Sequence, residues 1–230
     1  MRRRTIMWNR KEVKEKGKAN FKKNYGRSVL VALIYSIFFI STSSISSKTS
    51  AEQLQNNLET NPDFVYIFMA TMAVLSALIC IMTILDIFLL NPLEVGCMRF
   101  FLKNQDVEGD FGELGFAYKN NYLNSVLALF LRSIIVSIFF FLLVIPGWIL
   151  TYSYRMVPFI LADDPNVSAI DALKRSRAMM KGHKWNAFVY DLSFIGWFFL
   201  SFITLGIVGI FYVNPYKHNA DAALYQAIRG

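Results

Sequence analysis

Four charged side chains inside long apolar stretches are the residues of this 230-residue chain best placed to do chemistry: Asp86, Arg132, Arg155 and Asp191. An unpaired charge in a bilayer is costly, so such residues usually pair or mark a binding site. Two acids balance two arginines, and the arginine guanidinium matches the geometry of a carboxylate. The set predicts either a polar vestibule open to the cytosol, for an ion, a solute or a lipid head group, or structural ion pairs between helices.

Other residue types that support catalysis lack the spacing that catalysis needs. His183 and His218 are the only histidines, and neither has neighbours at metal-ligand spacing. The sequence has no G-x-S-x-G, P-loop or H-E-x-x-H motif. Cys80 and Cys97 do not form a C-x-x-C pair, so no disulfide framework is expected. The sequence therefore predicts no catalytic residue, no metal site and no cofactor, and it argues against an enzyme.

The composition indicates a membrane protein. Hydrophobic residues make up 55% of the chain and charged residues only 17%, whereas a soluble domain carries roughly 25% charged residues. Apolar stretches near the length of about 20 residues that a spanning helix needs lie at 26–46, 64–90, 122–145, 148–162, 185–203 and 205–214. The fourth and sixth are short. We expect one all-α domain over 1–230, a polytopic membrane bundle with about six spans.

Lysine and arginine are distributed asymmetrically around these spans. Eleven of the 24 lie at or before Arg27, whereas the loop 47–63 contains only Lys48. Positive residues collect in cytosolic loops, so the pattern predicts that both termini face the cytosol. The basic segment 1–25 and the apolar run that follows it could instead form a cleaved signal peptide, but the basic part is longer than is usual for a signal peptide. It could also bind nucleic acid, but no reader motif accompanies it, so no nucleic-acid partner is expected.

Similar segments recur along the chain. The stretches "KKNYGRSVLVAL", "KNNYLNSVLALF" and "GHKWNAFVYDLS" open the odd spans, and "NPLEVGCMRFF" and "NPYKHNADAAL" follow the second and sixth. The pattern predicts three helical hairpins, each preceded by a cytosolic helix. Helix breaks are expected at Pro146-Gly147, which marks a turn, and at Asn91-Pro92 and Asn214-Pro215, which should bend or end helices. Broken helices in related repeats could also flank a transporter's substrate site.

The segment 168–182 has the pattern of an amphipathic cytosolic helix. Ser168 and Asp171 form a capping box, and Gly182 can end the helix. Four cations favour one face: Lys174, Arg175, Arg177 and Lys181. Such a helix can lie along an anionic cytosolic leaflet. Alternatively, or in addition, its apolar face packs on its own bundle.

Several stretches together resemble a known family. They are "WNRKEVKEKGKANFKKNY", "NPLEVGCMRFFL", "SYRMVPFILADDPNVSAIDALKRSRAMMKGHKW", "DLSFIGW" and "TLGIVGIFYVNPY". This combination, spread over nearly the whole chain, is similar to the bacterial membrane family called domain of unknown function 975. The resemblance implies a multi-span membrane protein, mostly of Gram-positive bacteria such as Firmicutes, with no established activity and no ligand residues. The layout is more distantly similar to membrane domains beside some glycerophosphodiester phosphodiesterases, which hints at a lipid-related setting.

Three classes of function remain open on the sequence. The first is a non-enzymatic module of the bacterial plasma membrane that organises lipids or a partner complex. Its expected partners are membrane lipids, anionic on the cytosolic face, with a protein partner or a homo-oligomer. The second is a transporter of a small solute, an ion or a lipid through the cytosol-facing vestibule. An enzyme acting on lipid is the least supported.

Overall fold

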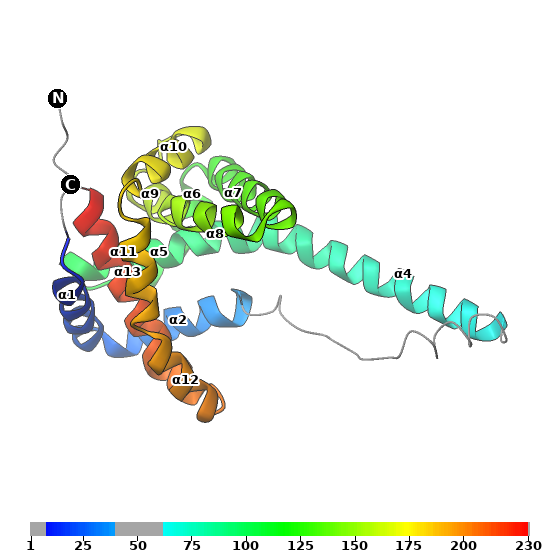
Figure 1. Cartoon of the computed structure of the whole chain (residues 1–230), viewed down its shortest axis with the longest axis horizontal. Helices are drawn as coiled ribbons and strands as arrows, with labels where there is room; N and C mark the ends of the chain where they lie inside the picture. Colours follow the sequence, from blue (N-terminus) through cyan, green and yellow to red (C-terminus); the bar gives the residue numbers. More distant parts are fainter. Residues whose placement is uncertain (1–7, 40–61, 230) are drawn as a thin grey trace.

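The protein is helical throughout the part of the chain that the computed structural model describes, residues 8–39 and 62–229, with no strand in these ranges (Figure 1). The all-α expectation is confirmed. In chain order the elements are α1 Arg10–Lys23, α2 Tyr25–Phe39, α4 Pro62–Leu85, η1 Asp86–Leu90, α5 Asn91–Asp106, η2 Phe111–Gly115, α6 Phe116–Lys119, α7 Tyr122–Leu142, α8 Val144–Ser153, α9 Val157–Asp163, α10 Ala169–Met179, α11 Lys184–Leu192, α12 Ile195–Ile203, η3 Gly209–Val213 and α13 Asn214–Arg229.

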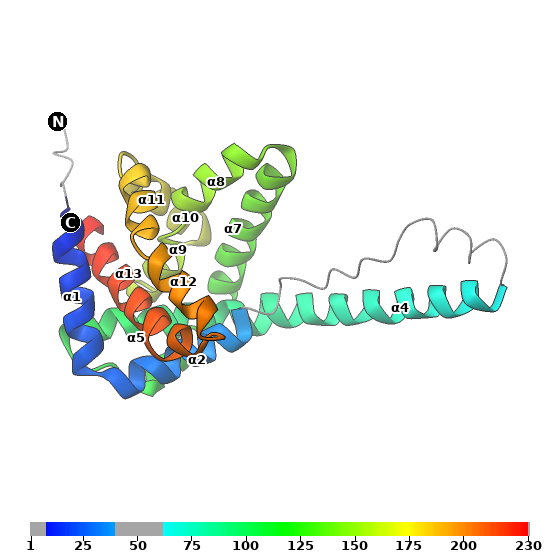
Figure 2. The ribbon, with the colours of Figure 1, turned by 60° about the horizontal axis from the view of Figure 1, so that its bottom comes forward.

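A compact base carries helices that project from it. In the base, α13 packs against α1 and α5, and α5 packs against α9, around fully buried side chains such as Phe100, Met156 and Leu224. The long helix α4 extends away from all the others, and α7 with α8 forms a separate arm (Figure 2). The side chains of α4 are exposed on every side over most of its length.

Three described helical stretches are long and apolar enough to cross a membrane: Val65–Asp106, Tyr122–Leu142 and Lys184–Ile203. They overlap the second, third and fifth predicted spans. The first, 26–46, coincides with α2 as far as Phe39, and its remaining residues lie outside the described ranges. The fourth and sixth, 148–162 and 205–214, do not form helices of spanning length. The described residues thus support three spanning helices, and the full set of six stays a prediction.

The expected break at Pro146-Gly147 is wrong, because both residues lie inside α8. The chain turns at Leu143 instead, whose φ of −153° and ψ of 118° are extended. Pro146 fits there because the first helical turn needs no intrahelical N–H bond. Gly147 allows close packing, since an added Cβ would lie 2.8 Å from the Cα of Phe140 on α7. α8 therefore folds back directly onto α7.

The predicted fourth span is two helices separated by a turn, and its orientation also differs from expectation. α8 ends at Ser153 and α9 begins at Val157. Spans four and five were expected to cross in opposite directions, but α8 and α11 run in the same direction where they touch. Phe188 of α11 contacts Trp148, and Asp191, one turn further on, bonds Tyr152 and Arg155.

The two Asn-Pro pairs do not end a helix, contrary to expectation. At Asn91-Pro92 the π-helix η1 continues into α5, and at Asn214-Pro215 the π-helix η3 continues into α13. Proline has no N–H and its ring clashes with the carbonyl four residues before it. A wider turn removes the clash: the N–H of Asn91 bonds to the oxygen of Asp86, five residues back, and that of Asn214 to Gly209. The two sequence repeats thus share a local fold.

The wide turn at η1 also exposes backbone carbonyls that other side chains bind. The carbonyl of Phe88, four residues before Pro92, accepts a hydrogen bond from Tyr122 Oη at 2.7 Å. The next carbonyl, of Leu89, accepts one from Tyr118 Oη. These bonds attach the start of α7 to the junction of α4 and α5.

The two ends of the described chain lie together. α1 and α13 run antiparallel, and Trp8 shares a surface pocket with Gln226 and Ala227. Trp8 Nε1 also donates a hydrogen bond to His183 Nδ1 at 3.2 Å, which brings the end of the α10 segment to the same place. One face of the base therefore holds both ends of the described chain and the start of α11.

The close packing of α5 on η2 yields a test of the fold. An added Cβ at Gly96 would lie 2.7 Å from the carbonyl carbon of Leu114, whereas one at Gly26 would meet nothing within 4 Å. We predict that Gly96→Ala lowers the free energy of unfolding by roughly 1–3 kcal/mol through overpacking. Gly26→Ala, the matched control, should be neutral or slightly stabilising. Thermal unfolding in mild detergent measures both, and equal melting temperatures would contradict the packing described.

Candidate functional site

A pocket of about 420 Å³ lies at the centre of the bundle, with walls from α2, α5, α7, α8, α9, α11 and α13. Three of the four charged residues expected to cluster line it: Arg132, Arg155 and Asp191. Glu94 and Asp221 line it as well. The fourth expected residue, Asp86, is exposed on η1, does not line the pocket, and forms no ion pair with any described residue.

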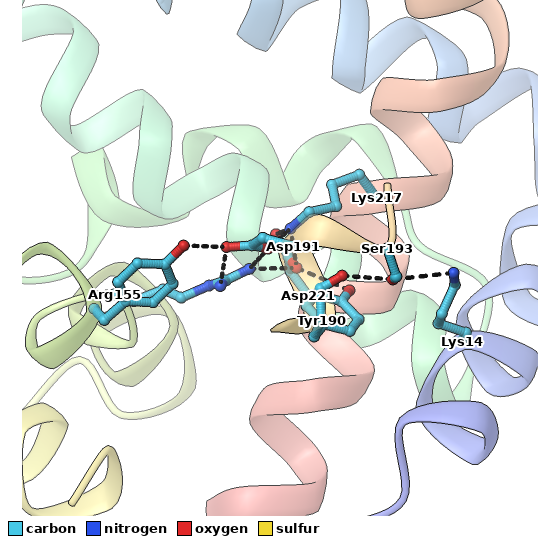
Figure 3. Close-up of polar contacts among 8 residues, drawn as sticks. Lys14, Arg155, Tyr190, Asp191, Ser193, Lys217 and Asp221 are labelled. Carbon is cyan, nitrogen blue, oxygen red and sulfur yellow. Dashed lines mark hydrogen bonds and ion pairs between the residues drawn. The ribbon is translucent and has the colours of Figure 1, made fainter. Parts of the chain in front are cut away.

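Arg155, Asp191, Lys217 and Asp221 form a closed set of ion pairs, here called the charge cluster (Figure 3). Arg155 binds Asp191 through both guanidinium branches, at 2.8 and 3.0 Å, and Asp221 at 2.8 Å. Lys217 Nζ lies 3.0 Å from Asp191 and 2.5 Å from Asp221, one helical turn away on α13. Each cation therefore pairs with both acids, and the four charges cancel.

Tyrosine hydroxyls complete the charge cluster. Tyr152 Oη donates to Asp191 at 3.0 Å, and Tyr190 Oη donates to Asp221 at 3.0 Å. The ammonium of Lys217 lies 4.9 Å from the centre of the Tyr190 ring, a distance that favours a cation–π contact. Charged groups taken out of water must find such partners. The carboxylates of the charge cluster thus have their acceptor sites occupied by protein donors.

Asp221 stays ionised because its cationic neighbours overcome the effect of burial. Burial alone would disfavour the charged carboxylate, but Lys217 and Arg155 lower the pKa of Asp221 to about 2. The neighbouring His218 loses its charge instead. Burial, helped by Lys217 and Arg155, lowers the pKa of its imidazole to about 4. His218 is therefore neutral near pH 7, and its ring stacks on Phe101 with 5.2 Å between ring centres.

A second ion pair faces the same pocket. Arg132 Nη1 on α7 lies 3.1 Å from Glu94 Oε1 on α5. The side chain of Arg132 is 30% exposed, whereas that of Glu94 is 9% exposed. Among the expected charges only Arg155 and Asp191 pair with each other, and Arg132 takes a partner that the sequence placed in a cytosolic loop.

Sequence reasoning missed Glu94, Lys217 and Asp221, although one signal pointed to two of them. The repeats "NPLE" and "NPYK" put Glu94 and Lys217 at the same place, two residues after the proline. Because the helix continues through both Asn-Pro pairs, each of these side chains lies on the first turn after a π-helix and reaches the charged centre. Asp221 follows Lys217 by one turn.

The helix predicted within 168–182 forms as α10, with its cap as expected. Asp171 N–H donates to Ser168 Oγ at 3.2 Å. Its apolar face packs inside the bundle, where Ala172 and Leu173 are buried. Its cations point outward, and Lys174, Arg175, Arg177 and Lys181 are all exposed. No group of three or more potential metal ligands occurs among the described residues.

The charge cluster predicts an unequal response to two substitutions. Asp221→Asn leaves Arg155 and Lys217 to share one carboxylate, and breaking a buried pair in this way costs roughly 3–5 kcal/mol of unfolding free energy. The double variant Lys217→Met with Asp221→Asn keeps the neutral Arg155–Asp191 pair and should regain most of that loss. Unfolding in mild detergent at pH 7 measures both.

The matched control for this pair of variants is Glu108→Gln, which breaks the exposed pair of Arg27 and Glu108. It should cost about 1 kcal/mol or less. A double variant as unstable as the sum of its single substitutions would contradict the closed arrangement of the four charges.

Comparison with known proteins assigns the chain to a family. The model of the family described as "Protein of unknown function (DUF975)" matches residues 111–230. No curated protein and no solved structure matches the chain. The matched region contains Arg132 and the whole charge cluster, whereas Glu94 precedes it. Since the match covers more than half of the 230 residues, the chain belongs to the DUF975 family of proteins of unknown function.

Proposed function

We propose that this protein is an integral protein of the bacterial cytoplasmic membrane that performs no catalysis and organises lipids or a partner complex there. The observation that carries the proposal is α4, whose apolar side chains are exposed around the whole helix. Exposed apolar surface of this extent needs lipid or another membrane helix as its surroundings. A helix also satisfies its own backbone hydrogen bonds, as the membrane interior requires.

The finer arrangement that we propose has the apolar segments entering the membrane and returning as hairpins, with both ends in the cytosol, although α8 and α11 do not form the antiparallel pair expected for spans four and five. Two local reversals support it: α8 folds back on α7, and η3 folds back on α12, with the rings of Trp197 and Tyr212 5.0 Å apart. The common location of Trp8 and Ala227 supports an even number of passages through the membrane. The basic residues of α1 and α10 suit the cytosolic side.

We propose that the protein performs no catalysis because the acids in the pocket are held in ion pairs. Within the described ranges, the acids that line the pocket are all ion-paired with arginine or lysine. A general acid or base needs a pKa near the working pH, whereas the cationic neighbours of Asp221 keep its pKa about 2. Fixed ion pairs suit assembly and binding better than proton transfer.

A second candidate function is transport of a small solute, an ion or a lipid through the central pocket. Its volume of about 420 Å³ falls in the range of small-molecule sites. Two helices with matching π-turns, at Asn91 and Asn214, carry charged residues to its centre, as discontinuous helices do in transporters. Uptake of labelled substrate into proteoliposomes would favour this candidate over a static module.

Cysteine labelling tests the arrangement in the membrane. Lys11→Cys and Gln226→Cys, each with Cys80→Ala, should both react with an impermeant maleimide from the cytosolic side. Leu205→Cys, at the exposed turn between α12 and η3, should react from the opposite side. The Cys80→Ala parent is the control, because its remaining Cys97 is buried. Labelling of Lys11→Cys and Gln226→Cys from opposite sides would rule the arrangement out.

The outward cations of α10 test the contact with lipids. The variant Lys174→Gln, Arg175→Gln, Arg177→Gln should lose several-fold of the preference for anionic lipid at low salt, since each cation near an anionic surface contributes about 1 kcal/mol. Brominated phosphatidylglycerol and phosphatidylcholine in nanodiscs, which quench tryptophan, measure the preference through the exposed Trp185.

The control for this experiment keeps the charges: Lys174→Arg, Arg175→Lys, Arg177→Lys should retain the preference. An unchanged preference in the glutamine variant would show that α10 does not contact anionic lipid.

A further inference from the structure

The charge cluster and the pair of Arg132 and Glu94 differ in how many of their hydrogen-bonding atoms already have protein partners. In the charge cluster, both oxygens of Asp191 and both of Asp221 accept bonds from protein donors (Figure 3). The pair of Arg132 and Glu94 meets through a single contact between Nη1 and Oε1. Since a guanidinium has five N–H donors and a carboxylate has two acceptor oxygens, this pair retains free capacity on both its donor and its acceptor side.

The free capacity is accessible from the pocket. Arg132 and Glu94 both line it, and the side chain of Arg132 is 30% exposed. Glu94 Oε2 accepts no hydrogen bond from any described residue. Every fully buried side-chain oxygen of the described residues has a hydrogen-bond partner. Glu94 Oε2 is therefore not fully buried, and a ligand can reach it. The site therefore offers N–H donors and an anionic acceptor side by side.

The charge balance restricts the ligand further. Three acids, Glu94, Asp191 and Asp221, face three cations, and His218 is neutral near pH 7. A ligand with a net charge would leave that charge uncompensated in a poorly solvated site, which is costly. A ligand of zero net charge avoids this cost, provided that it carries both an acceptor for Arg132 and a donor for Glu94.

From these observations we propose that the pocket binds a zwitterion, with its phosphate or carboxylate on Arg132 and its ammonium on Glu94 Oε2. The inference rests on the proposed membrane location and adds the class of ligand that the protein binds. Both an amine-bearing lipid head group and a free soluble zwitterion carry an anionic group and an ammonium.

The aromatic residues at the edge of the pocket suit a lipid head group. Trp148 lines the pocket and is exposed, and the ring of Phe188 lies between it and the exposed Trp185, with ring centres 5.9 and 5.3 Å away. Tryptophan concentrates at membrane–water interfaces, where head groups lie. Phe140 and Phe159 add apolar wall next to the charges.

The binding test uses the full chain in mild detergent and isothermal titration with four probes. Dihexanoyl-phosphatidylethanolamine supplies the zwitterion on short chains. Dihexanoyl-phosphatidylglycerol supplies the phosphate without the ammonium, and dihexanoyl-phosphatidylcholine supplies a cation without N–H. Glycerophosphoethanolamine supplies the zwitterionic head group without chains. We expect the ethanolamine lipid to bind at least tenfold more tightly than the glycerol and choline lipids.

Two variants place that binding in the pocket. Thr151→Trp fills the pocket from its exposed lining position on α8 and leaves every ion pair intact, so it should weaken binding at least tenfold. Glu94→Gln removes the negative charge that compensates the ammonium and should abolish the preference for ethanolamine over glycerol. Glu108→Gln, the same change in the exposed pair with Arg27, should alter neither.

The outcomes separate the sources and the hypotheses. Tight binding of the ethanolamine lipid alone identifies a lipid head group, and equal binding of glycerophosphoethanolamine identifies a soluble zwitterion. Equal affinity for the ethanolamine and glycerol lipids, binding that survives Thr151→Trp, or no binding of either zwitterion overturns the proposal. If the cysteine labelling meanwhile gives the expected topology, only this inference fails and the proposed membrane function stands.

Discussion

The charge cluster of Arg155, Asp191, Lys217 and Asp221 is the interaction on which the arrangement of the helices depends. Helices surrounded by lipid gain nothing from burying apolar surface against each other, because lipid tails are equally apolar. In such surroundings polar contacts decide which helices meet, whereas the base also packs around buried apolar side chains. Arg155 comes from the turn between α8 and α9, Asp191 from α11, and the other two from α13. In the observed alignment of these three segments all four charges cancel, so a shift in their register would separate charges that are now paired.

The wide π-turns determine which side chains reach this centre. A regular helix would need to end or kink at Asn91-Pro92 and Asn214-Pro215. The five-residue π-helices instead carry the chain through, so α5 and α13 begin with full helical geometry. Glu94 and Lys217 then occupy matching positions with opposite charge. Glu94 pairs with Arg132 on α7, whereas Lys217 pairs with Asp191 on α11 and with Asp221 on its own helix. The repeated Asn-Pro motif therefore produces the same backbone conformation twice, whereas the charged residues that follow it form two different sets of ion pairs.

Hydropathy and capping patterns predicted the features that are local, and tertiary contacts decided the rest. The all-helical class, the start of α7 and the cap of α10 follow from apolar length and from Ser168, and the structure agrees with them. Glu94, Lys217 and Asp221 lie in segments polar enough to resemble cytosolic loops, so their burial could not be read from composition. The turn at Leu143 and the parallel contact of α8 with α11 depend on how helices pack, which no local pattern reports.

The structural and the binding interpretations of the buried charges apply to different pairs. A carboxylate whose acceptor sites are filled by protein donors has nothing to offer a ligand, and displacing those donors would expose cations in a poorly solvated place. That condition describes Asp191 and Asp221. Arg132 and Glu94 share one contact only, so a ligand can bind them without breaking it. The neutral His218, whose pKa is about 4, keeps the total charge of the pocket balanced near pH 7. The fully bonded carboxylates Asp191 and Asp221 hold the helices together. Ligand binding is expected at Arg132 and Glu94, which keep free donors and a free acceptor.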